Sequence, residues 1–105
     1  MKKVCVVGVG AIGSHVVLLL RNCANVHMVD MDRVERKNVL SQFHAGNAVG
    51  KNKAVALQQL MRFLFNVKVD SVPHQLTRSN ATEILGGSDL VLDCLDNGEA
   101  GPFSV

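Results

Sequence analysis

Residues 3–13, KVCVVGVGAIG, join a short apolar run to a turn rich in glycine. A continuous apolar run of this length is typical of a strand that is buried on both faces of a sheet. Gly8, Gly10 and Gly13 form the pattern G-x-G-x-x-G. The first glycine permits a tight turn, the second lets the backbone approach a phosphate, and the third allows close packing of helix and strand. We therefore expect a strand–turn–helix unit that binds a nucleotide, with a purely structural turn as the alternative.

The remainder of the chain alternates between strand-like and helix-like stretches. We expect helices over residues 11–23, 51–65 and about 79–85, strands over 26–30, 67–72 and 89–95, and a long functional loop over 32–50. This alternation predicts an α/β fold, a Rossmann-like doubly wound parallel sheet of about four strands with helices on both faces. In the order 3-2-1-4, the fourth strand lies beside the first. Residues 1–97 would form this nucleotide-binding domain, and 98–105 a loose tail or the truncation point of a longer domain.

The composition narrows the classes of function. Apolar residues make up 48% of the chain and charged residues 19%, so a packed core is expected rather than disorder. A net charge of +2, with four Phe and no Tyr or Trp, is not the pattern of a nucleic-acid surface. The apolar runs are shorter than the roughly 20 residues of a membrane helix, and no signal peptide is visible. We therefore expect a cytoplasmic protein whose partners are neither nucleic acid nor membrane.

The cysteines and histidines show no spacing that indicates a metal site or a catalytic pair. These residues are Cys5, Cys23 and Cys94, and His15, His27, His44 and His74. The cysteines are far apart and include no C-x-x-C pair, which predicts reduced and mostly buried thiols. The histidines have no partners at ligand or relay spacing, so surface or packing roles are expected for them.

Two carboxylates stand at the end of the second expected strand. Asp30 follows Gly10 by 20 residues, the position from which a carboxylate accepts hydrogen bonds from ribose hydroxyls. Asp32 points the same way if the strand continues. Two carboxylates so close together disfavour a 2′-phosphate and therefore NADP. A solvated aspartate at a strand end is the alternative.

Two further carboxylates, Asp93 and Asp96, stand at the end of the fourth expected strand. In the order 3-2-1-4 this end faces the glycine turn across the ligand crevice. An acid near phosphates is repelled unless a cation bridges them, so Asp96 suggests Mg²⁺ held with a polyphosphate. A turn-forming Asp-Asn-Gly is an equally good interpretation from residue type alone.

Lys51 and Lys53 stand at the start of the helix that follows the long loop. Cations at this end oppose the helix dipole, at a cost of about 0.3–1 kcal/mol each when they are exposed. A lysine in this place could reach a phosphate. On residue type alone, a solvated pair of lysines is the favoured interpretation.

Together these segments resemble the ThiF/MoeB/HesA family, the bacterial relatives of ubiquitin-activating enzymes, from Val4 to Asn97. The resemblance rests on GVGAIG at 8–13, VDMDRVE at 29–35, Asn38, Gln42, GKNKA at 50–54 and DLVLDCLDN at 89–97. The last two segments are more specific than the glycine turn. Ordinary dehydrogenases do not pair an Asp-x-Asp strand end with a G-x-x-K helix start and a D-x-x-D-N turn.

The resemblance implies a function and a set of site residues. Members of the family bind ATP with Mg²⁺ and adenylate the C-terminal glycine of a small ubiquitin-like sulfur-carrier protein, often as homodimers. The implied phosphate contacts are the glycine turn with Ala11, Asn38 and Lys53. Asp30 would take the ribose hydroxyls, with Asp32 beside it, and Asp96 with Asn97 would hold Mg²⁺ or the nucleotide. Lys53 and Asp96 are then the expected catalytic residues, and Asp96 the expected metal ligand.

One departure from the family pattern keeps other functions open. The family commonly reads S-N-L-x-R-Q in the long loop, and Ser41 replaces the arginine here. Serine provides no charged bidentate contact to a phosphate. We expect the ATP-binding part of a ThiF-type adenylyltransferase. A non-catalytic ThiF-like subunit is one alternative, and an NAD-binding Rossmann module, which leaves Lys53 unexplained, is another.

Overall fold

The computed structural model describes residues 2–37, 39, 42 and 44–95. It contains a four-stranded parallel sheet in the order β3-β2-β1-β4. The strands are β1 (Lys3–Val7), β2 (Asn25–Val29), β3 (Asp70–Val72) and β4 (Leu90–Asp93). The predicted fold class and strand order are therefore confirmed. The predicted tail at 98–105 lies outside the described residues.

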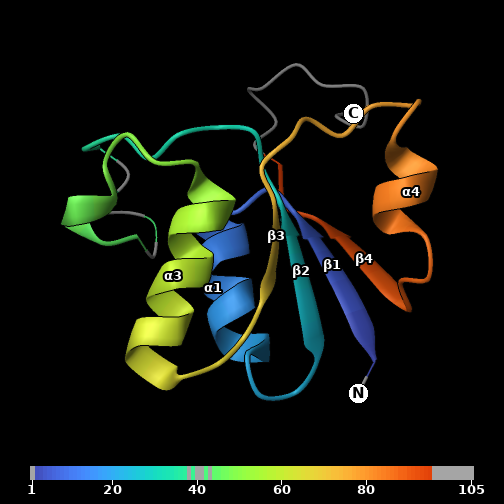
Figure 1. Ribbon diagram of the computed structural model, residues 1–105, viewed down its shortest axis with the longest axis horizontal. Coiled ribbons are helices and arrows are strands. Elements are labelled where there is room, and N and C mark those ends of the chain that lie inside the picture. Colours follow the sequence, from blue (N-terminus) through green and yellow to red (C-terminus); the bar gives the residue numbers. More distant parts are fainter. Residues whose placement is uncertain (1, 38, 40–41, 43, 96–105) are drawn as a thin grey trace.

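The helices cover both faces of the sheet. They are α1 (Ala11–Leu20), α3 (Lys53–Phe65) and α4 (Ala81–Leu85), together with a short 3₁₀ helix, η1 (Gly46–Ala48). Figure 1 shows α1 and α3 side by side on one side of the sheet and α4 on the other. Side chains alternate between the two faces along a strand. Val4 and Val6 of β1 therefore pack toward α1 and α3, whereas Cys5 and Val7 pack toward α4.

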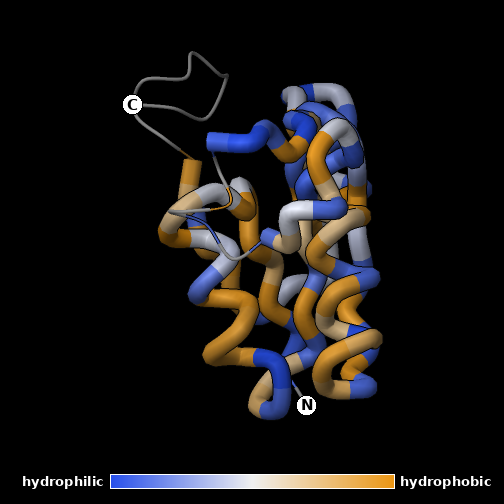
Figure 2. Tube along the Cα trace, turned by 90° about the vertical axis from the view of Figure 1, so that its left-hand side faces the viewer, coloured by the Kyte–Doolittle hydropathy of each residue, from blue (hydrophilic) through white to orange (hydrophobic). Residues whose placement is uncertain are grey.

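The larger of the two apolar layers lies between the sheet and the pair α1 and α3. Its fully buried members include Val17 of α1, Met28 of β2, and Leu57 and Met61 of α3. Figure 2 shows that α1 is apolar over most of its length, whereas α3 alternates between hydrophobic and hydrophilic residues. Helix α4 has five residues, and none of them is buried. The sheet is thus anchored mainly on its α1 and α3 face.

The ends of α3 are set by two asparagines. The Oδ1 of Asn52 accepts hydrogen bonds from the N–H groups of Ala54 and Val55, at 2.9 and 3.1 Å, so the helix begins at Lys53. Asn66 adopts the left-handed conformation (φ 53°) that commonly ends a helix. The predicted start at residue 51 was therefore wrong by two residues, because Asn52 caps the helix and Lys51 lies before the cap.

Other predicted boundaries also needed correction. Helix α1 ends at Leu20 rather than at residue 23, and residues 21–23 form a turn in which the Cys23 N–H donates to the Leu20 carbonyl at 3.0 Å. Strand β3 begins at Asp70 rather than at residue 67. The Val67 N–H donates instead to the Met61 carbonyl at the end of α3. Helix α4 and strand β4 are each shorter than predicted, at 81–85 and 90–93.

The two ends of the long loop between β2 and α3 are hydrogen-bonded to each other, and we call this pairing the closed base of the loop. The Val34 N–H donates to the Lys51 carbonyl, and the Gly50 N–H donates to the Val34 carbonyl, both at 2.8 Å. Arg33 and Asn52 form an antiparallel bridge beside them. Val34 is almost fully buried, and it packs with Ala48 and Ala56 in a small apolar cluster of its own. The first and last residues of the loop are thus held together at the N-terminus of α3.

Candidate nucleotide-binding site

The glycine turn between β1 and α1 is packed too closely for side chains at two positions. Gly8 has a φ of +93°, and an added Cβ would lie 3.0 Å from the backbone of Cys94 and Leu95. A Cβ on Gly13 would overlap the carbonyl oxygen of Gly8. Gly10 stands at the N-cap of α1. The first N–H groups of α1 have no partner within the helix and are available to an anion.

Asp30 is built into this turn from the end of β2. Only 7% of Asp30 is exposed, and its Oδ2 accepts a hydrogen bond from the Val9 N–H at 2.8 Å. Its Oδ1 accepts one from the Asp32 N–H, also at 2.8 Å. Burial raises the pKa of Asp30 above its ordinary value, while these two hydrogen bonds and the charge of Lys53 act in the opposite direction. Each carboxylate oxygen can accept a further hydrogen bond from a ligand hydroxyl.

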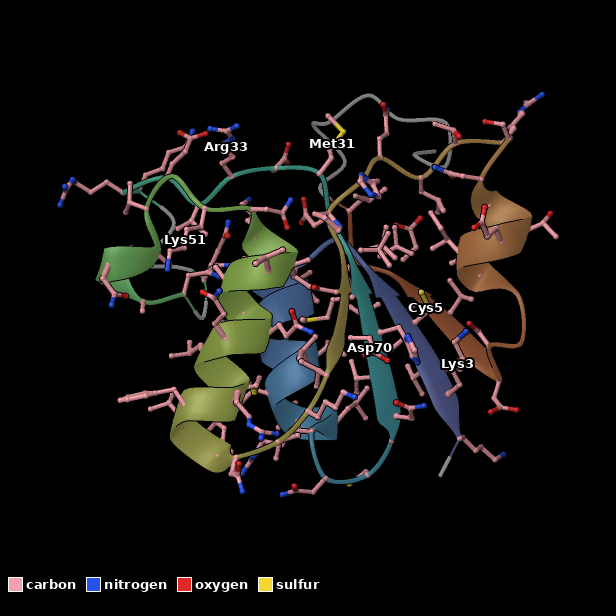
Figure 3. All side chains as sticks on the ribbon, in the orientation of Figure 1. Lys3, Cys5, Met31, Arg33, Lys51 and Asp70 are labelled. Atoms are coloured by element: carbon pink, nitrogen blue, oxygen red, sulfur yellow. The ribbon has the colours of Figure 1, made fainter. Side chains whose placement is uncertain are left out.

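Lys53 and Lys51 have different environments although they are two residues apart. Lys53 is buried, with 8% of the residue exposed, and its backbone N–H donates to the Asp32 carbonyl at 2.8 Å. Its ammonium group has no ion pair within the part of the chain that the structure describes. Lys51 is exposed, and its Nζ donates to the Oε1 of Gln59 at 3.3 Å. Figure 3 shows Lys51 and Arg33 at the N-terminal end of α3, away from Cys5 in the sheet.

A cavity of about 250 Å³ lies where β1, β2 and β4 end. It is lined by Gly8, Gly10, Ala11, Ile12, Asp30, Asp32, Gln42, Lys53, Cys94 and Leu95. Six of the predicted site residues are among these: two of the glycines, Ala11, both aspartates after β2, and Lys53. Gly13 lies behind the turn rather than in the wall. Strand β4 therefore does end beside the glycine turn, as the strand order predicted.

Three predicted site residues lie outside the described part of the chain. They are Asn38, Asp96 and Asn97. Asp93 is described and exposed, and its Oδ1 accepts a hydrogen bond from the Leu95 N–H at 3.1 Å. Within the described ranges, no group of three or more His, Cys, Asp or Glu side chains is placed to hold a metal ion. The predicted metal site at Asp96 therefore stays a prediction.

His44 is a residue of this region that the sequence did not reveal. It is 6% exposed, and its Nε2 lies 2.8 Å from the carbonyl oxygen of Val9, between two of the glycines. His27 also has a partner, because its Nδ1 lies 3.3 Å from the Oδ2 of Asp70 on β3. His44 is buried, as one of the expected packing roles implies, but its contact with the glycine turn was not predicted. Spacing gave no signal, because His44 and Val9 are 35 residues apart and meet only in the fold.

Gln42 is one of the residues on which the family resemblance rests, although no role was predicted for it. It lines the cavity, and its amide lies 3.5 Å from the position that a Cβ on Gly10 would occupy. The cysteines are free, as expected. Cys5 is buried and Cys94 is half-buried, whereas Cys23 is exposed, which corrects the expectation that the thiols are mostly buried for that residue. Among the described helices, none is long and apolar enough to cross a membrane.

This chain is similar to known proteins in both sequence and fold. The chain is 40% identical over 99 residues to a sulfur carrier protein adenylyltransferase of Thermus thermophilus, with 90% of this chain and 36% of that protein covered. It is 35% identical to the SAMP-activating enzyme E1 of Haloferax volcanii, with coverage of 90% and 37%. The chain thus spans about a third of the length of these relatives.

The fold is also similar to that of a solved structure. The tRNA N6-threonylcarbamoyladenosine dehydratase TcdA of E. coli, in complex with ATP, superimposes with a TM-score of 0.83 at 27% identity, covering 96% of this chain and 43% of that one. The model of the ThiF family matches residues 1–102. On the strength of this match, the chain belongs to the ThiF family.

Proposed function

We propose that this chain is the ATP-binding part of a ThiF-type adenylyltransferase that activates the C-terminus of a ubiquitin-like sulfur-carrier protein. The observation that carries the proposal is the buried Lys53, which lines the same cavity as the glycine turn and Asp30. Lys53 is a cation in the wall of this cavity, and within the described part of the chain its ammonium group has no ion pair. A polyphosphate is an anion suited to that position.

The walls of the cavity match the parts of a nucleotide. Backbone N–H groups at the start of α1 suit phosphate oxygens, and the Asp30 carboxylate suits ribose hydroxyls. A volume of about 250 Å³ is somewhat below the roughly 300–1,000 Å³ of typical small-molecule sites. The described walls would therefore hold the sugar and phosphates, with the remainder of ATP outside them.

Mg²⁺ is a further part of the proposal. Asp96 and Asn97 directly follow Leu95, which lines the cavity, so their place in the chain supports a position near the phosphates. Oxygen ligands of this type suit Mg²⁺, which usually binds through one or two carboxylates and substrate phosphates. When bound, the ion would neutralise charge on the pyrophosphate that leaves as AMP is transferred to the carboxylate of the carrier.

The carrier substrate is supported by the relatives rather than by the cavity. The relatives from Thermus thermophilus and Haloferax volcanii are named for a sulfur carrier protein and for SAMP activation, whereas TcdA is named for a tRNA modification. The greater sequence identity favours the carrier. A homodimer and a cytoplasmic location stay predictions, the former to be measured by sedimentation equilibrium.

Calorimetric titration with ATP and Mg²⁺, and separately with NAD, tests the proposed ligand. We expect ATP to bind more tightly than NAD, and Lys53→Met to weaken ATP binding at least tenfold, because a charged hydrogen bond to phosphate is lost. Lys51→Met is the matched control, since Lys51 is an exposed lysine on the same segment, and it should leave the affinity within about twofold. Tighter binding of NAD, or equal losses in the two variants, would contradict the proposal.

Catalysis is tested separately from binding. ATP–pyrophosphate exchange, dependent on a carrier protein and measured with the natural full-length protein, is expected if the site adenylates. ATP binding without exchange would favour the alternative of a non-catalytic ThiF-like subunit. The replacement of the family arginine by Ser41 fits that alternative, because serine provides no charged contact to a phosphate.

A further inference from the structure

We propose that His44 is a positioning residue that holds the glycine turn in its phosphate-binding shape by fixing the Val9 peptide groups. This inference rests on the proposed function only for the identity of the ligand, ATP, that the turn binds. The contact itself is a property of the free protein. It assigns a purpose to the side chain by which the long loop contacts the turn.

Both polar backbone groups of Val9 are bound by buried side chains. The Val9 N–H donates to the Oδ2 of Asp30, and the Val9 carbonyl accepts from the Nε2 of His44, each at 2.8 Å. The Val9 side chain is fully buried in the apolar layer beneath α1 and α3. Val9 therefore has little freedom to rotate, and the turn on either side of it is fixed at its midpoint.

The contact also fixes the tautomer of the neutral His44 ring. A carbonyl oxygen only accepts hydrogen bonds, so the Nε2 of His44 carries the hydrogen and the neutral ring keeps its lone pair on Nδ1. That Nδ1 is buried and has no hydrogen-bond partner among the described residues. Burial lowers the pKa of His44, and the charge of Lys53 acts in the same direction.

The groups that face His44 come from three elements. Lys53 of α3 and His15 of α1 oppose a positive charge on the ring, whereas Asp30 after β2 favours one. Protonation would place a second cation beside Lys53 and leave the new Nδ1–H without an acceptor in the described part of the site. The Val9 carbonyl itself raises the pKa of His44, because the neutral Nε2–H tautomer and the imidazolium both donate through Nε2. Burial is the larger influence and favours the neutral ring, and the hydrogen bond to the turn is available in either form.

His44 contributes a hydrogen bond to the turn in addition to filling volume. An apolar side chain of similar size would occupy the same volume but would deprive the Val9 carbonyl of this donor. The turn could then rotate at Val9, and the N–H groups that follow would no longer converge on a phosphate. The role is testable because the hydrogen bond and the volume are separable by substitution.

The test compares His44→Gln, whose Nε2 amide can still donate to the Val9 carbonyl, with His44→Leu, which fills the volume without a donor. We expect His44→Leu to weaken ATP binding about tenfold, and His44→Gln to stay within about threefold of the wild type. His74→Gln is the control, because His74 is exposed, and it should leave the affinity unchanged.

A second readout needs no nucleotide. Nitrogen chemical shifts of the wild-type protein should show the Nε2–H tautomer for His44 and a protonation midpoint below the ordinary histidine value of 6.5. The Val9 amide should also exchange faster with solvent in His44→Leu than in His44→Gln. A His44 whose protonation midpoint is not below 6.5, and which lacks the Nε2–H tautomer, would overturn the proposal even if His44→Leu did not fold.

The two readouts separate this inference from the proposed function. Wild-type ATP affinity in a folded His44→Leu, or equal losses in the Leu and Gln variants, would overturn the positioning role. A wild-type protein that binds no ATP would contradict the proposed function instead. In that case the tautomer and the Val9 exchange rates would still decide whether His44 fixes the turn.

Discussion

The glycine turn, residues 8–13, and the long loop, residues 32–50, meet at the same cavity but are built in different ways. The turn is defined by local chemistry, because Gly8 and Gly13 allow backbone and helix to approach more closely than side chains permit. The loop is defined by distant partners, through its base at the N-terminus of α3 and the contact of His44 with Val9. A short motif can be recognised in a sequence, whereas a loop of this kind is understood only in the fold.

The largest effect that separates the two regions is expected from a single methyl group. In Gly13→Ala the added Cβ would overlap the Gly8 carbonyl oxygen and lie 3.2 Å from the Cβ of Cys94. Backbone atoms on both sides would have to move, so we expect the free energy of unfolding to fall by about 3 kcal/mol. Urea unfolding followed by circular dichroism measures this loss.

The loop supplies the matched control for that variant. A Cβ added at Gly46 meets no atom within 4 Å, and Gly46 is not among the residues with positive φ. Gly46→Ala should therefore change the stability by less than about 0.5 kcal/mol. If Gly13→Ala were tolerated equally well, the close packing of α1 on the turn would not be a requirement of the fold.

An intermediate effect is expected where the loop joins α3. Asn52→Ala removes the cap of α3 and the hydrogen bond from the Asn52 Nδ2 to the Asp30 carbonyl, at 2.9 Å. Loss of a cap costs about 1 kcal/mol, up to about 2, and Lys53 would lose part of the support that holds it in the site. Thermal unfolding and ATP affinity should both decline. Asn47→Ala, at an exposed position of the same loop, should alter neither, and a similar decline there would argue against a specific role for the cap.

The smallest effect is a dependence of stability on pH. His44 has a pKa below its ordinary value of 6.5 in the folded protein, so the unfolded chain binds more protons between these two values. Stability due to this group is therefore complete above pH 6.5 and is lost as the pH falls toward the folded pKa, by at most about 1.4 kcal/mol per pH unit.

Comparison with a variant isolates this contribution. Asp30 has a raised pKa and gives a slope of opposite sign, in a window that begins at its ordinary value of 3.8. Urea unfolding at several pH values should show a shallower decline below pH 6.5 in His44→Gln than in the wild type. Identical slopes would mean that His44 is not buried in its neutral form.

Much of the fold was predictable because its determinants are local in the sequence. The apolar run at Lys3–Val7 and the glycines defined β1 and the start of α1, and the alternation of elements predicted the strand order. Asp30 was found by its distance from Gly10. Its hydrogen bond to Val9 was not foreseen, because the geometry of the turn determines it.

The unpredicted parts of the site depend on contacts across the fold. The burial of Lys53 follows from the cap at Asn52 and from the bond to the Asp32 carbonyl, and no pattern of charge distinguishes Lys53 from Lys51. His44 reaches Val9 from an irregular segment, so periodicity gave no indication of it. The roles proposed for Asn38, Asp96 and Asn97 stay predictions.

The closed base of the long loop has a consequence for how this protein can be altered. The start of α3 is held by the hydrogen bonds of Val34 to Gly50 and Lys51 and by the packing of Ala48 on Ala56, and none of these contacts involves Gly46 or Asn47. Gly46 and Asn47 are exposed, and doubling the length of a flexible loop costs only about 0.6 kcal/mol in closure entropy. This tip is therefore a suitable point for grafting an affinity peptide or a fluorescent reporter beside the site, while the geometry between Asp30 and Lys53 is retained.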